Sequence, residues 1–299
     1  MEDLWLENEH INLNLTKLAQ KVIESDCKIF GASSNSQLTR STLINRVLMD
    51  YEDDFELNED LVKLKDYESY FKIRLSKGSL KKLDSLSLQS DSHFVQTYTA
   101  PQYIKCIMET YARLPFIERE KLLLKETIIE PIKNAIARKQ ALNLVYKNEA
   151  IKVSPIYIQP AKEGTFQYLI GMREKYIVSI RLSRIQSIKA SGRATMITDE
   201  DEKSINENLA EFGATFIKDQ PVTIKVRFTA KGIESYEYSI IHRPMHIAVE
   251  ENNIFVFHCS ETQALYFFFR FAGNAEILEP LSLRNRMRDL YQAGLNNYM

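Results

Sequence analysis

The chain repeats itself at an offset of 60 residues, and this repeat limits what its first third can fold into. Residues 9–55 align with residues 69–115 without a gap. In both copies apolar and polar residues alternate over eight positions, 10–17 and 70–77, which is the period-two pattern of a half-buried strand. Each copy ends in a segment, 39–51 or 99–111, that starts with Thr and has apolar residues at the spacing of one buried helical stripe.

A second amphipathic helix is predicted between strand and helix in each copy. The apolar residues at helical spacing are Leu18, Val22 and Ile23 within 17–30, and Leu80, Leu83 and Leu86 within 77–88. The predicted unit is therefore strand, helix, helix, used twice. A single short strand leaves its ladder hydrogen bonds open, and so small a core is marginal. We expect the two copies to pair their strands within one domain, residues 1–115.

This duplicated unit resembles the ribbon-helix-helix family, whose members make the same pair by dimerisation and insert the two-stranded ribbon into the major groove of DNA. The resemblance implies a pseudo-dimer within one chain, with outward side chains that read bases. Asn can pair with adenine and Arg with guanine. Polar residues also suit a merely solvated ribbon face, and spacing does not separate the two interpretations. The outward positions are His10, Asn12, Asn14, Tyr70, Lys72 and Arg74.

The two repeats differ in charge. Residues 1–60 hold 5 Lys/Arg and 13 Asp/Glu, a net of −8, whereas residues 61–120 hold 10 and 7, a net of +3. An acidic surface repels phosphate and loses the counterion-release contribution to duplex affinity. We expect the first repeat to serve as a structural or protein-docking half, and the second to keep more of the binding capacity.

Residues 116–140 are predicted to be a helical linker, with Pro131 in the first turn of a new helix. The pattern then changes to short strands separated by turn signals, at 142–146, 152–158, 166–171 and 177–182. Such a series favours a small, strongly bent sheet or a barrel, residues 141–192.

This region resembles the WYL domain, an Sm-like β-barrel that binds nucleic acid or another ligand. The matching segments are Val153-Ser154-Pro155, Tyr168-Leu169-Ile170-Gly171 and Ile180–Ile185, and the eponymous triplet falls on Gln167-Tyr168-Leu169. Gln167 replaces the Trp, which removes any stacking role of that ring. Residues 221–296 resemble the C-terminal extension of WYL proteins, which implies an α/β sandwich-type dimerisation domain at 193–299. The expected fold class of the whole chain is α+β.

The charge count also indicates a binding role for the predicted barrel. From Lys121 to Lys189 there are 13 Lys/Arg against 5 Asp/Glu, a net of +8 in a chain whose total is −1. Cations can hold phosphates while aromatic faces stack unpaired bases, which suits single-stranded RNA. Alternatively, the charges are only solvated and the tyrosines fill the core. The candidate binding residues are Lys152, Arg173, Lys175, Arg181, Arg184, Tyr146 and Tyr168, with Tyr157 and Tyr176 interleaved.

Arg181 and Arg184 are three residues apart and would face opposite sides of an ideal strand. A bend or a strand end must lie between them if both line one site. The WYL resemblance favours binding by this pair, although Arg184 could also cap carbonyl groups at the barrel rim.

Sequence patterns of catalysis, metal binding or cofactor binding are missing. His242 and His246 have the i, i+4 spacing of a helical metal pair, but Pro244 between them opposes a helix. The sequence has no Walker loop, dinucleotide-binding turn or nucleophile elbow. We expect a protein that is not an enzyme and needs no cofactor.

Three scattered cysteines indicate buried thiols in a reducing compartment, and no apolar run reaches membrane length. We therefore expect a cytoplasmic protein that does not insert into membranes. The apolar run 265–271 predicts a buried helix or strand, or part of a homodimer interface.

Three functions fit these patterns. The combination of ribbon-helix-helix pseudo-dimer, WYL barrel and extension resembles the accessory proteins of type VI-D CRISPR effectors, which bind single-stranded RNA and enhance the RNA-guided RNase. The second is a transcriptional regulator that reads DNA with the ribbon and senses a ligand with the barrel. The third is an adaptor whose acidic repeat docks a protein. Because the two ribbon repeats sum to −5 and the barrel block to +8, the first is favoured.

Overall fold

The structure is a computed structural model that describes residues 10–31, 38–50, 58–66, 70–87, 98–217 and 221–299. Its architecture is mixed α+β, with antiparallel strand pairs in three sheets. The chain divides into two compact units, Met1–Pro155 with Ile180–Ala194, and Ile156–Ser179 with Thr195–Met299. The expected fold class is therefore confirmed.

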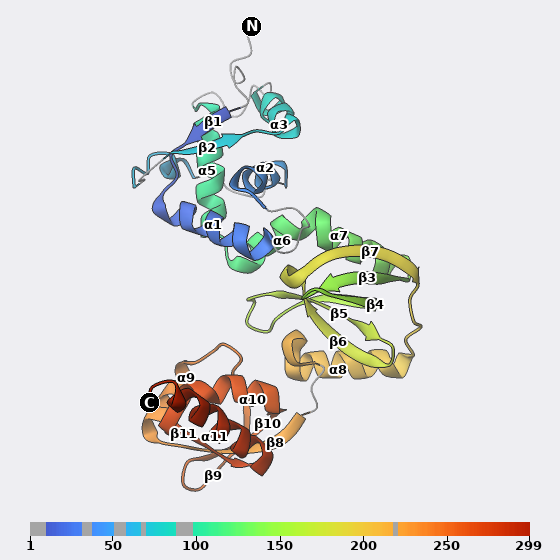
Figure 1. Ribbon diagram of the computed structural model, residues 1–299, viewed down its shortest axis with the longest axis vertical. Coiled ribbons are helices and arrows are strands. Elements are labelled where there is room, and N and C mark those ends of the chain that lie inside the picture. Colours follow the sequence, from blue (N-terminus) through green and yellow to red (C-terminus); the bar gives the residue numbers. More distant parts are fainter. Residues whose placement is uncertain (1–9, 32–37, 51–57, 67–69, 88–97, 218–220) are drawn as a thin grey trace. The chain divides into compact units, whose positions relative to one another are not determined.

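In the residues that the structure describes, each copy of the 60-residue repeat contains one strand and two helices (Figure 1), at the places where the alternating and helical spacings predict them. The 3₁₀ turn η1 (Glu59–Leu61) lies between the copies. The first copy contains β1 (His10–Leu13), α1 (Lys17–Gly31) and α2 (Arg40–Asp50), and the second contains β2 (Phe71–Arg74), α3 (Lys77–Ser87) and α5 (Ala100–Arg113).

Strands β1 and β2 pair with each other in an antiparallel two-stranded sheet. Asn12 lies opposite Lys72, and these two residues are one repeat length apart. On either side of this pair, Ile11 lies opposite Ile73 and Leu13 lies opposite Phe71, so the pairing is symmetric about Asn12 and Lys72. The register is thus the one that a two-fold axis between the copies requires, as in an isologous dimer interface. Both copies turn alternate residues inward, where Leu13 and Ile73 are buried.

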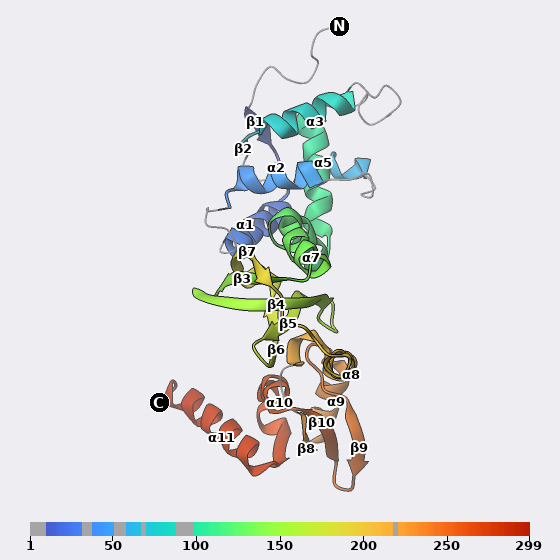
Figure 2. The same cartoon turned by 90° about the vertical axis from the view of Figure 1, so that its right-hand side faces the viewer.

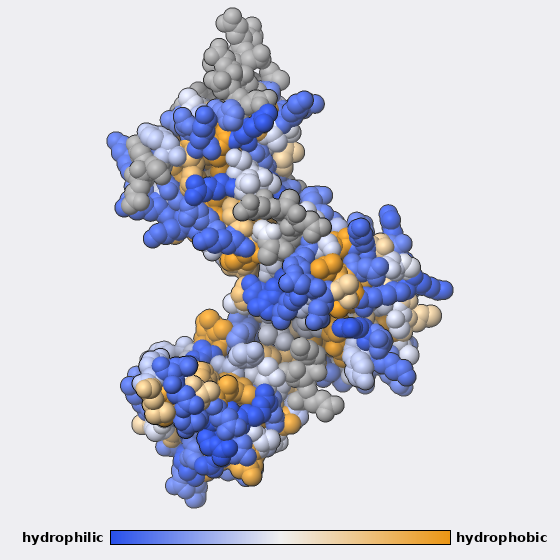
Figure 3. All heavy atoms as spheres, viewed as in Figure 1, coloured by the Kyte–Doolittle hydropathy of each residue, from blue (hydrophilic) through white to orange (hydrophobic). Residues whose placement is uncertain are grey.

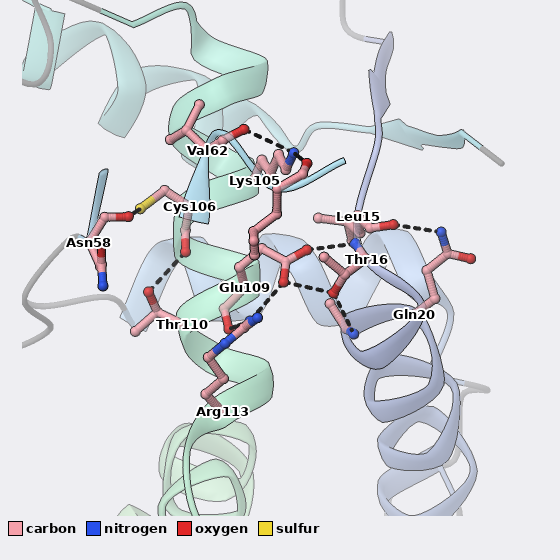
Figure 4. A network of polar contacts seen from close by, with 12 residues as sticks. Leu15, Thr16, Gln20, Asn58, Val62, Lys105, Cys106, Glu109, Thr110 and Arg113 are labelled. Carbon is pink, nitrogen blue, oxygen red and sulfur yellow. Dashed lines mark hydrogen bonds and ion pairs between the residues drawn. The ribbon is translucent and has the colours of Figure 1, made fainter. Parts of the chain in front are cut away.

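A buried carboxylate ties the second copy to the first (Figure 4). Glu109 of α5 accepts hydrogen bonds from the backbone N–H of Thr16 at 2.6 Å and from its hydroxyl at 2.8 Å. Thr16 in turn accepts from the N–H of Ala19 in the first turn of α1. Arg113, one turn further along α5, donates to the same carboxylate at 2.7 Å. Glu109 therefore completes the N-terminal cap of a helix 93 residues away.

The reciprocal contact is made by Asn45 of α2. Its side chain accepts from the N–H of Ser76 at 2.7 Å and donates to the carbonyl of Arg74 at 2.8 Å, where β2 leads into α3. Each copy's last helix thus holds the start of the other copy's first helix. The residues are not equivalent in the repeat, because Asn45 aligns with Lys105. Lys105 instead donates to the carbonyls of Val62 and Leu64.

A second buried polar cluster joins α1, α5 and α6 (Phe116–Leu124). The hydroxyl of Tyr111 donates to Asp26 at 2.6 Å, and Arg119 donates to the same oxygen at 2.8 Å. Burial, together with the Asp26 carboxylate, raises the pKa of Tyr111 well above its usual range. Asp26 occupies the buried stripe of α1, whereas Leu18, which the pattern assigns to that stripe, is half exposed.

Helices continue from the repeat to the central sheet. After α6 come the π-helical turn η2 (Lys125–Ile129) and α7 (Glu130–Ala137), and Pro131 lies in the first turn of α7 as predicted. Arg46 of α2 donates to the carbonyl of Leu123 at 2.8 Å, which attaches this helical segment to the first copy.

Five strands of the central region form one sheet in the order β6-β5-β4-β3-β7. The predicted strands are confirmed, but the barrel is not closed. The 3₁₀ turn η3 (Leu182–Arg184) leads from β6 into β7, and these edge strands form no ladder with each other. The strands are β3 (Gln140–Tyr146), β4 (Glu149–Pro160), β5 (Gln167–Arg173), β6 (Tyr176–Arg181) and β7 (Ile185–Arg193).

The second unit contains α8 (Asp199–Phe216), bent at Gly213, and a four-stranded antiparallel sheet in the order β11-β8-β10-β9. Figure 2 shows α10 and α11 on one side of this sheet. The remaining elements are β8 (Pro221–Phe228), α9 (Ala230–Tyr238), β9 (His246–Glu250), β10 (Ile254–Ser260), α10 (Glu261–Phe268), the 3₁₀ segment η4 (Phe269–Asn274), β11 (Ala275–Glu279) and α11 (Leu281–Asn296).

The apolar run 265–271 spans the end of α10 and η4. Phe267, Phe268 and Phe271 are buried against Phe228 and Phe257 of the sheet, which confirms burial for these three residues, whereas Tyr266 and Phe269 of the same run are exposed. No helix in the described ranges is long and apolar enough to cross a membrane.

Replacing Glu109 by Ala should lower the free energy of unfolding by about 3 kcal/mol, because two donors of Thr16 lose a buried acceptor and Arg113 loses its partner. Urea unfolding followed by far-ultraviolet circular dichroism measures this change. The control is Glu118→Ala, which breaks an exposed pair with Lys121 and should cost less than about 0.5 kcal/mol. Equal losses for both variants would contradict a cross-linking role of Glu109.

Candidate nucleic-acid interface

The outer face of the β4-β3-β7 sheet in the first unit carries a row of polar side chains. Asn143 lies opposite Lys152 of β4 on one side and opposite Lys189 of β7 on the other. Residues that face each other across antiparallel strands share one side of the sheet, and neighbouring strands are about 4.8 Å apart, so the two lysines stand roughly 10 Å apart. All three side chains are exposed.

Strand alternation explains why this row faces outward. Leu142 and Leu144 flank Asn143 along β3 and are buried on the opposite side, together with Val153. In the part of the chain that the structure describes, Lys152 and Lys189 form no ion pair. Their ammonium groups are therefore available to bind phosphate oxygens.

Further cations lie at the ends of the same strands. Arg193 ends β7 opposite Gln140, and Arg138 and Lys139 lie between α7 and β3. Lys147 begins the tight turn between β3 and β4, and its ammonium nitrogen is 5.6 Å from the centre of the Tyr146 ring. All four cations are exposed. Tyr146 itself is half-buried, and its side chain lies on the other face of the sheet from Lys152.

Arg181 and Arg184 are separated by the predicted strand end, since β6 stops at Arg181 and η3 follows. Their environments differ. Arg181 is half-buried, donates to the hydroxyl of Ser183 at 2.8 Å and lies 6.0 Å from the centre of the Phe116 ring. Arg184 is exposed. Arg181 therefore packs within the first unit, whereas Arg184 is the more accessible cation.

Three further predicted residues belong to the second unit. Arg173 ends β5 and Lys175 lies in the turn to β6, and both are exposed. Tyr168 is half-buried against an apolar cluster that includes Ile170 and Ile205. This placement agrees with the interpretation of Tyr168 as a core tyrosine.

Of the six outward positions predicted for the ribbon, Asn12, Asn14, Lys72 and Arg74 lie on the outer face of the β1-β2 sheet or at its end. Asn12 and Lys72 are cross-strand partners, and Arg74 pairs with His10. Lys72, Arg74 and Asn12 are exposed, and Asn14, just after β1, is partly buried. The ribbon and the β4-β3-β7 face are therefore two separate candidate surfaces within the first unit.

Sequence reasoning missed Lys189 and Asn143. The segment Ile185-Gln186-Ser187-Ile188-Lys189 does not alternate with period two, and a bulge shifts the pairing of β3 with β7, so no local sequence pattern places Lys189 on the outer face. Asn143 has no distinguishing sequence signal, because its position between two lysines depends on the register of three strands.

Possible reactive centres are sparse. Among the described residues, no group of three or more His, Cys, Asp or Glu side chains could hold a metal ion. Burial raises the pKa of the Cys259 thiol to about 12, and burial with the nearby Asp26 raises that of Cys27 to about 11. Both thiols are therefore protonated at neutral pH. The nucleophilic form of a cysteine is the thiolate, so neither thiol is activated as a nucleophile.

No protein-family model matches the chain, and no curated protein matches its sequence. A solved structure described as a CRISPR Cas-related protein aligns with 97% of this chain and 94% of its own, with a TM-score of 0.72 and 19% sequence identity. The two proteins share a fold. Proteasome accessory factor B/C of Arthrobacter aurescens aligns with 78% of this chain and 39% of its own at 17% identity, with a TM-score of 0.30, which is too low to indicate a common fold.

The two arginines should respond differently to truncation. Arg181→Ala should lower the free energy of unfolding by about 1–2 kcal/mol, because it removes a hydrogen bond and the packing of the guanidinium near Phe116. Arg184→Ala should change it by less than about 0.5 kcal/mol, as an exposed substitution. Urea unfolding of both variants checks this difference. A stable Arg181 variant would show that this side chain is not part of the packing.

Proposed function

We propose that the chain is a CRISPR-associated protein without catalytic activity that binds single-stranded RNA and enhances an RNA-guided RNase. The fold that it shares with a CRISPR Cas-related protein supports the association. The resemblance to accessory proteins of type VI-D effectors supplies the effector class. The observation that carries RNA binding is the row of Lys152, Asn143 and Lys189 on an exposed sheet face, inside a block with a net charge of +8.

The chemistry of this face suits a flexible strand better than a duplex. Two lysines held on the strands that flank β3 can each hold a phosphate, and Asn143 between them can donate to or accept from a base or a ribose hydroxyl. The exposed cations at the strand ends extend the positive surface in the same unit. We regard the five-stranded sheet as part of a WYL-like domain, and the resemblance of Tyr168-Leu169-Ile170-Gly171 in β5 to that family supports this assignment.

A second candidate function is DNA recognition by a ribbon-helix-helix pseudo-dimer. The specific observation in its favour is the β1-β2 register, which exposes Asn12, Lys72 and Arg74 on the outer face around a local two-fold axis. Asn and Arg are suited to reading adenine and guanine in the major groove. The summed charge of −5 over both repeats opposes strong duplex affinity. We therefore rank this function second.

We also propose that two copies associate through α11. Leu290 and Leu295 of this helix are 44% and 52% exposed. Beside them a groove between α11 and β11 has a volume of about 820 Å³ and is lined partly by Leu281, Met287 and Tyr291. Exposed apolar side chains next to an apolar groove on one element suit a two-fold interface.

Lys152→Ala combined with Lys189→Ala should weaken binding of single-stranded RNA by at least about tenfold and flatten the dependence of log affinity on log salt by about 1.4, the contribution of two phosphate contacts. Filter binding with single-stranded RNA, single-stranded DNA and duplex DNA at several salt concentrations measures both quantities. The double variant Lys72→Ala, Arg74→Ala should have the smaller effect on RNA.

Lys203→Ala with Lys231→Ala, two exposed lysines of the second unit, is the matched control and should leave affinity unchanged. Unchanged RNA affinity in the Lys152 and Lys189 variant would exclude the sheet face as the binding site. Duplex DNA affinity that exceeds RNA affinity and falls with the Lys72 and Arg74 variant would instead support the DNA regulator.

Adding the protein to a type VI-D effector with its guide should raise the initial rate of target RNA cleavage, and the Lys152, Lys189 variant should raise it less. Cleavage of a fluorogenic RNA measures the rate, and the protein alone should cleave nothing. RNA binding without any change in effector rate would refute enhancement while leaving the binding proposal intact.

A further inference from the structure

Strand β9 is an exposed edge of the C-terminal sheet. In the order β11-β8-β10-β9 it pairs with β10 alone among the described strands, and Figure 2 shows it as the outermost strand. All five of its residues are exposed, and Met245, Ile247 and Val249 have exposed fractions of 65%, 64% and 55%. Edge strands usually carry Lys or Pro, which discourage pairing. Residues 246–250 contain neither, although a bulge interrupts their pairing with β10.

A cavity of about 430 Å³ adjoins this edge within the second unit. Met245 and Ile247 form part of its wall, and Phe212, Phe216 and Pro244 form other parts of its apolar lining. Figure 3 shows apolar side chains reaching the surface of the C-terminal region. A cavity of this volume can take one large apolar side chain and leave room for the backbone that carries it.

The bend in α8 forms part of the cavity wall. Gly213 has φ +71°, which a residue with a side chain rarely adopts, and a Cβ there would lie 2.8 Å from the Lys162 side chain. The bend at Gly213 lies between Phe212 and Phe216 along the chain, and both of these residues line the cavity. The hydroxyl of Thr215, also on this wall, has no hydrogen-bond partner among the described residues.

The charged groups of the cavity wall indicate which charge a ligand would carry. The two cations already have partners: Lys162 donates to the carbonyl of Glu211 at 2.6 Å, and Arg243 donates to the carbonyl of Glu237 at 3.0 Å. The carboxylate of Glu211 is 54% exposed, and its only ionic contact among the described residues is His258 at 3.8 Å. A cationic group of a ligand could form an ion pair with this carboxylate.

Outside the cavity lining, the rest of α8 is also acidic. Residues Asp199–Phe216 contain six acidic side chains and one lysine, a net of −5. By contrast, hydrogen bonds from His242 hold the pKa of Glu163 below its ordinary value, and this carboxylate is already engaged with His242.

We propose that β9 and the adjoining cavity bind an extended segment of a protein partner that carries alternating apolar and basic residues. The segment adds a strand to the free edge of β9, inserts one bulky apolar side chain beside Ile247 and Phe212, and places a Lys or Arg against Glu211. Backbone pairing supplies affinity in this mode, and the side-chain pocket supplies specificity. The inference concerns the second unit only and does not rest on the proposed RNA binding.

Two other occupants fit less well. A nucleic acid would bring phosphates toward Glu211 and the other acidic residues of α8 and be repelled. A second copy pairing β9 with β9 would bring two glutamate-bearing strand ends together and would supply no cation for Glu211 from either β9.

Selection of random 12-residue peptides displayed on phage against the full chain tests the proposal, with the folded Ile247→Lys variant used for counter-selection. Enriched peptides should alternate apolar residues with Lys or Arg. A selected peptide, measured by fluorescence polarisation, should lose at least about tenfold in affinity for Ile247→Lys and about threefold or more for Glu211→Lys, because each removes one contact class. Met196→Lys, at an exposed apolar position outside the cavity, should bind like the native chain.

Methylation of alternate backbone nitrogens in the peptide should also abolish binding, because it removes the strand pairing. If Ile247→Lys fails to fold, Met245→Lys, at another exposed residue of the cavity wall, replaces it. The proposal is overturned if no peptide is enriched, if acidic peptides are enriched, if the methylated peptide binds equally well, or if single-stranded RNA displaces the peptide. Sedimentation in which Ile247→Lys converts a dimer into monomers would assign the edge to a second copy and overturn it as well.

Discussion

Two strands of four residues, placed 60 residues apart in the chain, form a ladder with each other and with no other described strand. This pairing brings the two repeats into one domain and decides which side chains face the core. The buried polar contacts then hold the copies in place from both sides, through Glu109 in one direction and Asn45 in the other. The helical segment that leads to the central sheet is attached to this domain through Arg46 and Arg119.

Sequence patterns were sufficient where a residue's position depends on its neighbours along the chain. The period of two located β1 and β2, the helical stripes located α2 and α5, and Pro131 located the start of α7. The same patterns failed for Leu18, because the buried stripe of α1 runs through Ala19, Ile23, Asp26 and Phe30 and leaves Leu18 beside it. A carboxylate is buried there only because Tyr111 and Arg119 reach it from 85 and 93 residues away, which no local pattern records.

The candidate binding face was predictable as a region but not as a set of contacts. The basic block, residues 121–189, can be located by counting charged residues, because its net charge of +8 follows from the sequence alone. The individual partners depended on register, which aligned Lys152 and Lys189 on either side of Asn143 and turned Tyr146 toward the opposite face. Arg181 and Arg184 are close in sequence, yet only Arg184 is freely exposed. The prediction of a closed barrel was also wrong, because the positions of the strands along the chain do not determine whether the two edge strands pair with each other.

The local two-fold axis of the ribbon passes between Asn12 and Lys72, which are different residues. In a dimer of identical chains both positions must carry the same side chain, and a bound DNA site is then an inverted repeat. Fusion of the two halves removes this requirement, because a substitution in one half is not copied into the other. Any duplex that this ribbon contacts can therefore be asymmetric in sequence, and its two strands can be distinguished.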